Sequence, residues 1–374
     1  MSLSKSRQLE LLQQRAQGMK HALLSGDQPT GLQPSELFLV EEQNPVYMSL
    51  QPEMGRGFVV SILAYWIGLP MLILWLLTGY QAITSGRDWE IAFFGPATLF
   101  VLIGIPILWT MLEPLQLPIL LNRRTQEIYF EHNHELYHAP WDGIQALVYE
   151  FKTASHYTGS STHACLEILM HRLNHPDDII YANLGGVPIA KNVVQQASFW
   201  EYLRAYMNNG PWFDENGNPS ESDAFVRSQL KYMQTRPSRH LPNLWQVLKN
   251  KRSTGETITS GERWELFFAI LYYPCPWLQD QIYKVALKQS SKRWPSYVLE
   301  RLQADGPTTR LVDLEAQWQV NGQGPERPTL KWYVKLWRAL PSFDAMLKVF
   351  MGLCLALVVL SVLSLIVLTY MGII

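Results

Sequence analysis

Three long runs of uncharged residues constrain this chain more than any other feature of its sequence. Residues 58–80, 91–112 and 349–370 contain no Asp, Glu, Lys or Arg over 23, 22 and 22 positions. An α-helix rises about 1.5 Å per residue, so each run is long enough to cross a hydrocarbon layer of roughly 30 Å. Trp and Tyr residues lie at the ends of the runs, as is common where helices leave a bilayer. The sequence therefore predicts three transmembrane helices.

Basic residues near these runs predict the orientation of the helices. The loop between the first two runs carries only Arg87, and the segment after Tyr370 carries no basic residue. Because Lys and Arg accumulate on the cytoplasmic side, the N-terminus and residues 113–348 are predicted to be cytoplasmic, and the C-terminus to lie on the other side of the membrane. The cytoplasmic basic residues are Arg56, Arg123, Arg124, Lys331, Lys335, Arg338 and Lys348.

The charge balance excludes several classes of protein. With 31 Lys and Arg against 32 Asp and Glu, the chain has no excess positive charge for binding nucleic acid. The three runs contain no ionisable group of the kind that transporters and proton pumps need within the membrane. Three Cys are too few for a disulfide scaffold, and Cys165 and Cys275 are expected to be free thiols that fill packing positions.

The regions outside the runs divide into distinct parts. Residues 1–56 begin with apolar side chains at three- and four-residue spacing, which predicts an amphipathic helix followed by a Pro-containing extended connector. This helix could dock on the cytoplasmic domain or lie on the bilayer, and docking is favoured. The other parts are a transmembrane hairpin (57–112), a sheet domain (113–209), a mainly helical domain (210–348) and a final transmembrane helix (349–374).

Alternating apolar and polar residues after the second run predict short β-strands. An amphipathic helix over residues 189–207 follows them. Antiparallel strands that end in one such helix indicate a curved sheet capped by the helix. The expected fold class is thus an α+β integral membrane protein. The predicted strands are 119–121, 127–130, 135–138, 145–152, 165–170 and 178–184.

One corner motif suggests a family. The residues Trp141-Asp142-Gly143-Ile144 resemble the Trp-x-x-Ile corner of pleckstrin-homology-like domains. Together with the two N-terminal runs and the motif Leu121-Asn122-Arg123-Arg124-Thr125-x-x-Ile128-Tyr129, residues 57–207 are similar to an uncharacterised bacterial inner-membrane family. That family is often encoded beside type VI secretion effectors. The resemblance implies a pleckstrin-homology-like sheet, a multi-pass location in the bacterial inner membrane with a periplasmic C-terminus, and a genetic context, without an established activity.

The region from residue 210 onward is rich in Trp and mainly helical. The best helix candidates are residues 223–233, 244–250 and 262–289, the last interrupted at Pro274-Cys275-Pro276. Its aromatic stretch, residues 266–273, is too short to span a membrane. It suits either a core helix or a segment that dips into the cytoplasmic leaflet. The core interpretation is favoured.

No catalytic motif is found in the sequence. There is no GxSxG nucleophile elbow and no GxxxxGK[ST] phosphate loop. Several His residues fall between positions 132 and 175, but neither Cys at finger-like spacing nor an HExxH context accompanies them. No catalytic, cofactor or metal residue is therefore assigned, and a non-enzymatic protein is expected. The His residues weighed for a metal were His132, His134, His138, His171 and His175.

Basic and aromatic residues provide the candidate contacts to lipid or partner. Arg123 and Arg124 stand close after the second run, where they would reach anionic headgroups or reflect only the usual cytoplasmic bias of basic residues. A Trp-rich basic segment before the third run suits an interfacial helix. The candidate contacts are Arg123, Arg124, Trp141, Lys331, Lys335 and Arg338.

The leading hypothesis is a membrane-anchored binding protein whose partners are the lipid bilayer and a protein. The family resemblance implies immunity to, or accessory handling of, a type VI secretion toxin, acting by binding and occlusion. A lipid-binding or signalling module without a toxin partner is the alternative. A membrane enzyme acting on lipids is a third possibility, for which the sequence offers no polar catalytic cluster.

Overall fold

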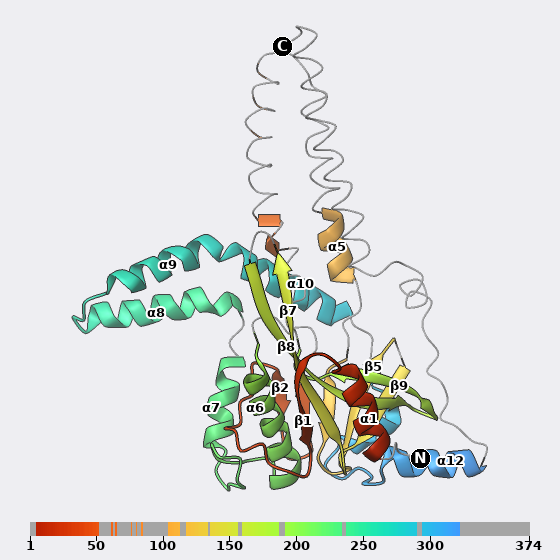
Figure 1. Ribbon diagram of the computed structural model, residues 1–374. Coiled ribbons are helices and arrows are strands. Elements are labelled where there is room, and N and C mark those ends of the chain that lie inside the picture. Colours follow the sequence, from red (N-terminus) through yellow and green to blue (C-terminus); the bar gives the residue numbers. More distant parts are fainter. Residues whose placement is uncertain are drawn as a thin grey trace. The chain divides into compact units, whose positions relative to one another are not determined.

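The computed structural model describes two compact units of the chain (Figure 1). The first unit comprises residues 1–54, 116–235 and 292–328, and the second comprises residues 55–115, 236–291 and 329–374. The described residues are 5–51, 104–112, 117–133, 135–155, 159–186, 191–233, 237–289 and 294–321, with a few isolated positions between 61 and 84.

A nine-stranded antiparallel sheet dominates the described part of the first unit. The strands follow the order β1-β7-β8-β6-β5-β4-β3-β2, and β9 pairs with β8. Hairpins join β2 to β3, β4 to β5 and β5 to β6. The pairing of β3 with β4 instead brings residues 47–50 against residues 119–122, which are distant in the sequence. The strands are β1 (Lys20–Ser25), β2 (Val40–Gln43), β3 (Tyr47–Leu50), β4 (Ile119–Asn122), β5 (Glu127–His132), β6 (Glu135–Pro140), β7 (Gln145–Ser155), β8 (Gly159–Arg172) and β9 (His175–Asn183).

The two faces of this sheet have separate cores. Successive side chains of a strand point to opposite faces, so Leu121 and Ile128 enter one core while their neighbours Leu120 and Tyr129 enter another. Helix α6 (Val193–Arg204) covers the first face and packs against β1, β7 and β8. A capping box at Asn192 and Gln195 starts this helix.

Two separate segments cover the opposite face. Helix α1 (Lys5–Arg15) packs on β7, where Leu12 and Ala16 are buried. Helices α11 (Ser296–Arg301) and α12 (Leu311–Asn321) contribute Val298 and Leu311 to the core above β4, β5 and β6. The first unit therefore has helices on both faces of its sheet.

The Trp141 corner joins β6 to β7. The Trp141 amide donates to the Gln126 carbonyl, and the indole nitrogen donates to Asn208 Oδ1 at 2.6 Å. Gly143 adopts a φ of 70°, which favours glycine. The Trp141 ring stacks on Trp200 of α6 with centroids 5.2 Å apart. This corner thus ties the sheet to its covering helix.

Helices alone make up the described part of the second unit. Helix α5 packs against α10, and α8 packs against α9. The one-turn helix η4 contacts α8 and α10. The elements are α5 (Ile105–Leu112), η4 (Pro237–Arg239), α8 (His240–Ser253), α9 (Ser260–Tyr272) and α10 (Pro274–Gln289); α7 (Ala224–Met233) and the π-helix η3 (Ala205–Asn209) belong to the first unit.

The predicted transmembrane architecture requires correction. Among the residues that the structure describes, none of the helices combines the length and apolar character needed to cross a bilayer. Helix α5 (Ile105–Leu112) is the described helix within the predicted runs. This finding contradicts the three-span fold class, the membrane and transmembrane assignment and the multi-pass inner-membrane location. Most of residues 57–112 and all of 349–374 lie outside the described residues.

The N-terminal region also differs from the sequence prediction. The predicted helix ends at Arg15 in the structure, because Gly18 adopts a φ of 80° and the chain continues as β1. Met19, just before β1, and Leu23, within it, pack against the same core as Leu12 and Ala16. The expected connector contains β2 and β3. Residues 20–50 therefore extend the sheet instead of linking it to another part.

Candidate functional site

Ionisable side chains are buried where α12 crosses the sheet. His138 of β6 and His171 of β8 are direct partners in the strand ladder, and their ring centroids lie 4.3 Å apart. Glu315 of α12 faces both rings, and Glu127 of β5 lies on the other side of His138. These four residues are all buried. We call them the His–Glu cluster.

One carboxylate oxygen joins the two imidazoles. Glu315 Oε2 lies 3.2 Å from His138 Nε2 and 3.0 Å from His171 Nε2. The other oxygen, Oε1, accepts the Asn174 amide. His138 Nδ1 lies 3.8 Å from Glu127 Oε1. Neither ring nitrogen of His138 meets a partner with hydrogen-bond geometry. The cluster is thus closely spaced but not saturated with hydrogen bonds.

The cluster shifts the pKa values of its members in opposite directions. Burial alone would lower the pKa of His138, but the carboxylates of Glu127 and Glu315 outweigh it and raise that pKa. Burial lowers the pKa of His171, and the positive charge of His138 adds to the effect. Burial opposes ionisation of Glu315, yet its interactions with both His residues hold its pKa well below the usual value. The cluster therefore favours ionised carboxylates with at most one charged imidazole.

Hydrogen bonds from β4 and the following turn also hold the α11 region. Asn122 Nδ2 donates to the Arg301 carbonyl at 3.0 Å. Arg124 donates to the carbonyl of Gln303 and, at 2.6 Å, to that of Gly306. These bonds satisfy carbonyl groups that follow the short helix α11. The C-terminal segment of the first unit is therefore fastened to the sheet by polar contacts as well as by its apolar core.

The candidate contact residues predicted from the sequence differ in their burial and in the contacts that they make. Arg124 is bound to the carbonyls just described, and Arg123 makes one long contact of 3.5 Å to the Pro45 carbonyl. Trp141 is 2 % exposed and belongs to the core, so its ring is closed to lipid or partner. Lys331, Lys335 and Arg338 lie outside the described residues. Among the described candidates, the buried Trp141 therefore does not share a surface with Arg123 and Arg124.

Large apolar side chains are exposed on the helix pair α8–α9 of the second unit. Trp264 is 60 % exposed, and none of the residues of α9 is buried. The core interpretation of residues 266–273 is therefore wrong. The rings of Trp264, Phe267, Phe268 and Tyr272 contact one another along α9. We call Trp264, Phe267, Phe268 and Tyr272 the aromatic surface; Trp245, Val247 and Ile270 of the same helix pair are also exposed.

The helix pair that carries the aromatic surface is nearly neutral. Residues 240–272 contain four Lys and Arg against three Glu. Lys251 Nζ lies 2.5 Å from a carboxylate oxygen of Glu262. Glu262 also forms the capping box of α9 with Thr259. This ion pair links α8 to α9. The exposed aromatic rings, and not a net charge, therefore dominate the recognition properties of this surface.

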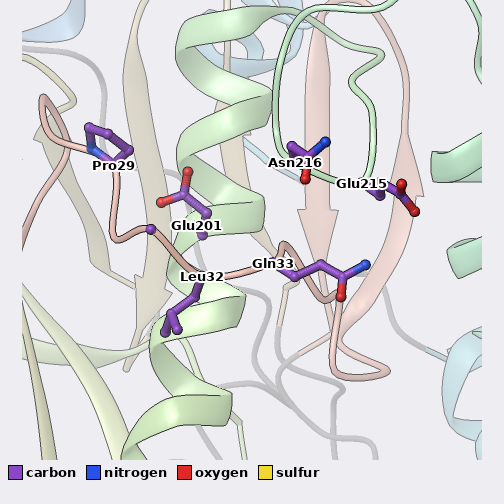
Figure 2. A pocket seen from close by; sticks show the side chains of 7 residues that line it. Pro29, Leu32, Gln33, Glu201, Glu215 and Asn216 are labelled. Carbon is purple, nitrogen blue, oxygen red and sulfur yellow. The ribbon is translucent and has the colours of Figure 1, made fainter.

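A third feature is an open hollow of about 550 Å³ beside α6. Figure 2 shows Glu201 of α6 near Pro29 and Leu32, with Glu215 and Asn216 on a separate loop. Glu201 Oε2 accepts the amide and hydroxyl of Thr30, while Oε1 accepts Arg204. The buried carboxylate of this hollow is therefore already used to anchor the chain after β1.

Comparisons with known proteins provide no relative. The chain matches no protein family, no curated protein and no solved structure. The functional argument therefore rests on the residues themselves.

Sequence reasoning did not identify the two main features of the structure. His138 and His171 were visible as neighbours of other His residues, but Glu315 is 144 positions away from His171. The register of β6 against β8 brings the two imidazoles together. The aromatic stretch of α9 was recognised, although its exposure was not.

Proposed function

We propose that this chain is a non-enzymatic binding protein that captures a protein partner on the aromatic surface. The observation that carries the proposal is the exposure of Trp264, Phe267 and Phe268, between 48 % and 60 % each, on adjacent turns of one helix. Contiguous exposed aromatic groups mark interaction sites in proteins. Trp and Tyr are also the residue types that most often dominate binding energy at protein interfaces.

The charge of the helix pair favours a protein partner over an anionic surface. Lys251 is paired with Glu262, and Glu256 and Glu265 further offset the remaining basic residues. Membrane-surface helices usually carry a strong excess of Lys and Arg opposite their apolar side. An apolar groove or helix on another protein fits this nearly neutral surface better.

The family resemblance supports a specific biological role. We propose that the partner is a type VI secretion toxin or a component that handles it, and that binding occludes the toxin from its target. The chain would then act as an immunity or accessory protein. This role needs no catalytic group and no cofactor.

A survival assay with matched variants tests this proposal. Cells receive the full chain together with the effector encoded beside its gene. The double variant Trp264→Ser/Phe267→Ser alters the aromatic surface, and Val320→Ser alters a control side chain that is 85 % exposed on α12. We expect the wild type and Val320→Ser to protect and the double variant to fail. Equal protection by all three proteins would exclude the aromatic surface, and no protection by any of them would exclude immunity.

A second candidate function is binding at a lipid surface, favoured by the presence of Trp and Tyr on the same helix pair. Cosedimentation with phosphatidylglycerol-containing vesicles distinguishes it. Binding by the wild type that the double variant loses would support lipid recognition by α8–α9. Equal recovery of both proteins in the supernatant would reject it.

A further inference from the structure

We propose that His138, His171 and Glu315 bind a divalent transition-metal ion, Zn²⁺ being the best match, which fastens α12 to the sheet. The ligand atoms of these three residues lie within 4.8 Å of one another. All three side chains are buried, and they come from β6, β8 and α12. The proposal is independent of the aromatic surface.

Two of the three ligand-to-ligand distances are close to those of a tetrahedral site. Glu315 Oε2 lies 3.2 Å from His138 Nε2 and 3.0 Å from His171 Nε2, and all three ligand atoms lie within 4.8 Å of one another. Two ligands at Zn–N and Zn–O bonds of about 2.0 to 2.2 Å in a tetrahedral arrangement are about 3.3 to 3.6 Å apart. Small shifts of these side chains would accommodate the ion, with a water molecule as the fourth ligand.

The environment of His138 calls for a positive charge, which a metal ion on Nε2 supplies as well as a proton on the ring does. His138 is fully buried, and neither of its ring nitrogens has a partner in hydrogen-bond geometry. Carboxylates face the ring from both sides, Glu315 near Nε2 and Glu127 near Nδ1. A neutral imidazole would have to point one lone pair at a carboxylate. With the ion on Nε2, Nδ1–H points towards Glu127, an arrangement common around metal-bound His.

The charges of the site point the same way. Glu127 and Glu315 together supply two negative charges that a divalent ion balances. The neighbouring Arg301 donates to the carbonyls of Tyr297 in α11 and of Thr309 after it, so these donors bind main-chain carbonyls and not the two carboxylates. A donor set of two imidazoles and one carboxylate suits zinc better than calcium or magnesium, which prefer oxygen.

Hydrogen bonds hold the Glu127 carboxylate in place beside His138. Its Oε1 accepts the Val312 amide at 3.1 Å, and its Oε2 accepts the Tyr129 hydroxyl at 2.9 Å. These bonds fix the carboxylate that faces His138. Glu127 is therefore a positioning residue, whereas His138, His171 and Glu315 are the ligands.

Metal retention by the full chain tests the proposal. Protein stripped with a chelator is incubated with Zn²⁺, desalted and analysed for bound metal. We expect one Zn²⁺ per chain, at least tenfold weaker binding in His171→Gln and Glu315→Gln, and unchanged binding in the control His175→Gln, whose side chain is exposed. We expect Glu127→Gln to weaken binding about tenfold to a hundredfold while keeping the stoichiometry. Absence of stoichiometric Zn²⁺ in the wild type, or wild-type retention by His171→Gln/Glu315→Gln, would overturn the site.

Two measurements on the wild type avoid dependence on the folding of the variants. Co²⁺ in place of Zn²⁺ should give the intense visible absorption of a tetrahedral ion, and Zn²⁺ should abolish it. Bound Zn²⁺ should also slow amide hydrogen exchange in residues 311–321 but not in residues 260–272. Weak octahedral-type absorption that Zn²⁺ does not displace, or equal exchange with and without Zn²⁺, would contradict the proposal.

Discussion

The two units of this protein place polar and apolar groups in opposite ways. The sheet unit buries Glu127, His138 and Glu315 beneath α12, whereas the helical unit exposes Trp264 and Phe267 on α9. Buried polar groups and large exposed apolar patches are the two departures from ordinary globular packing that carry most information. The comparison teaches that the first unit uses charge to hold itself together and that the second offers apolar surface to another molecule.

The largest expected effect comes from removing the central carboxylate of the His–Glu cluster. Glu315→Gln leaves the buried His171 imidazole and the Asn174 amide without an ionised partner, and leaves His138 with Glu127 alone. We expect the free energy of unfolding to fall by about 3 to 5 kcal/mol, because breaking a buried ion pair leaves a charge uncompensated. Urea denaturation in the presence of a chelator, followed by Trp fluorescence, measures this loss.

A control on the same helix sharpens this result. Asp313→Asn changes an exposed carboxylate of α12, and we expect a change within about 0.5 kcal/mol. Equal destabilisation by both substitutions would show that α12 depends on helix charge in general and not on the cluster.

The second prediction concerns another buried acid of the sheet unit. Burial raises the pKa of Glu36 to about 7, so the folded state holds a proton that the unfolded chain releases near its ordinary value of 4.5. The stabilisation is complete below the unfolded pKa and is lost as the pH rises through the folded pKa. From about pH 5 to about pH 8 we expect unfolding to become easier by about 2.5 kcal/mol.

The substitution Glu36→Gln isolates this contribution. The amide keeps a neutral acceptor for the Phe38 amide and has no charge to bury. We expect the difference in unfolding free energy between wild type and variant to vanish at acid pH, to widen between about pH 5 and pH 7, and to stay constant at higher pH. A constant difference between about pH 5 and pH 7 would show that Glu36 does not titrate as proposed.

The third prediction separates two adjacent Arg residues. Arg124→Ala removes bonds to the carbonyls of Gln303 and Gly306, and we expect a loss of about 1 to 2 kcal/mol. Arg123→Ala removes one long contact to Pro45, and we expect a change below about 0.5 kcal/mol. Thermal denaturation of both variants makes the comparison. Equal effects would contradict the view that Arg124 fastens the region after α11.

Only a small loss of stability is expected when the aromatic surface is altered. Trp264→Ser/Phe267→Ser removes exposed rings of α9, so the urea midpoint should correspond to a change within about 1 kcal/mol. Trp200→Ser, which removes a buried ring of α6, should instead cost about 3 to 5 kcal/mol. A large loss from the double variant would show that these rings support the fold and would weaken the proposed binding role.

Local periodicity allowed the sequence to predict much of the sheet and its covering helix. Alternation over residues 119–121 and 127–130 corresponds to β4 and β5, and the amphipathic pattern near residue 200 corresponds to α6. Where patterns were ambiguous, prediction was less accurate. The spacing of Met19 and Leu23 continues the helical period of α1, yet these residues lie after the turn at Gly18.

The membrane prediction shows what hydropathy leaves open. Residues 91–112 satisfy the length and charge criteria for a span, whereas none of the helices in the described part of the chain meets them. An apolar run crosses a bilayer only as one continuous helix, because every backbone group must be satisfied within the segment. Composition records that a run is apolar, but continuity of the helix is a property of the folded chain.

The sequence by itself determined which segments alternate as strands, where Trp141 forms a corner and which helix carries the aromatic residues. These are local properties, set by periodicity and by turn residues such as Gly143. Only the tertiary structure decided that His138 meets His171 across two strands, that Glu315 closes on both, and that Trp264 is exposed while Trp200 is buried. Contacts between distant segments depend on strand register and helix docking, which no window of neighbouring residues encodes.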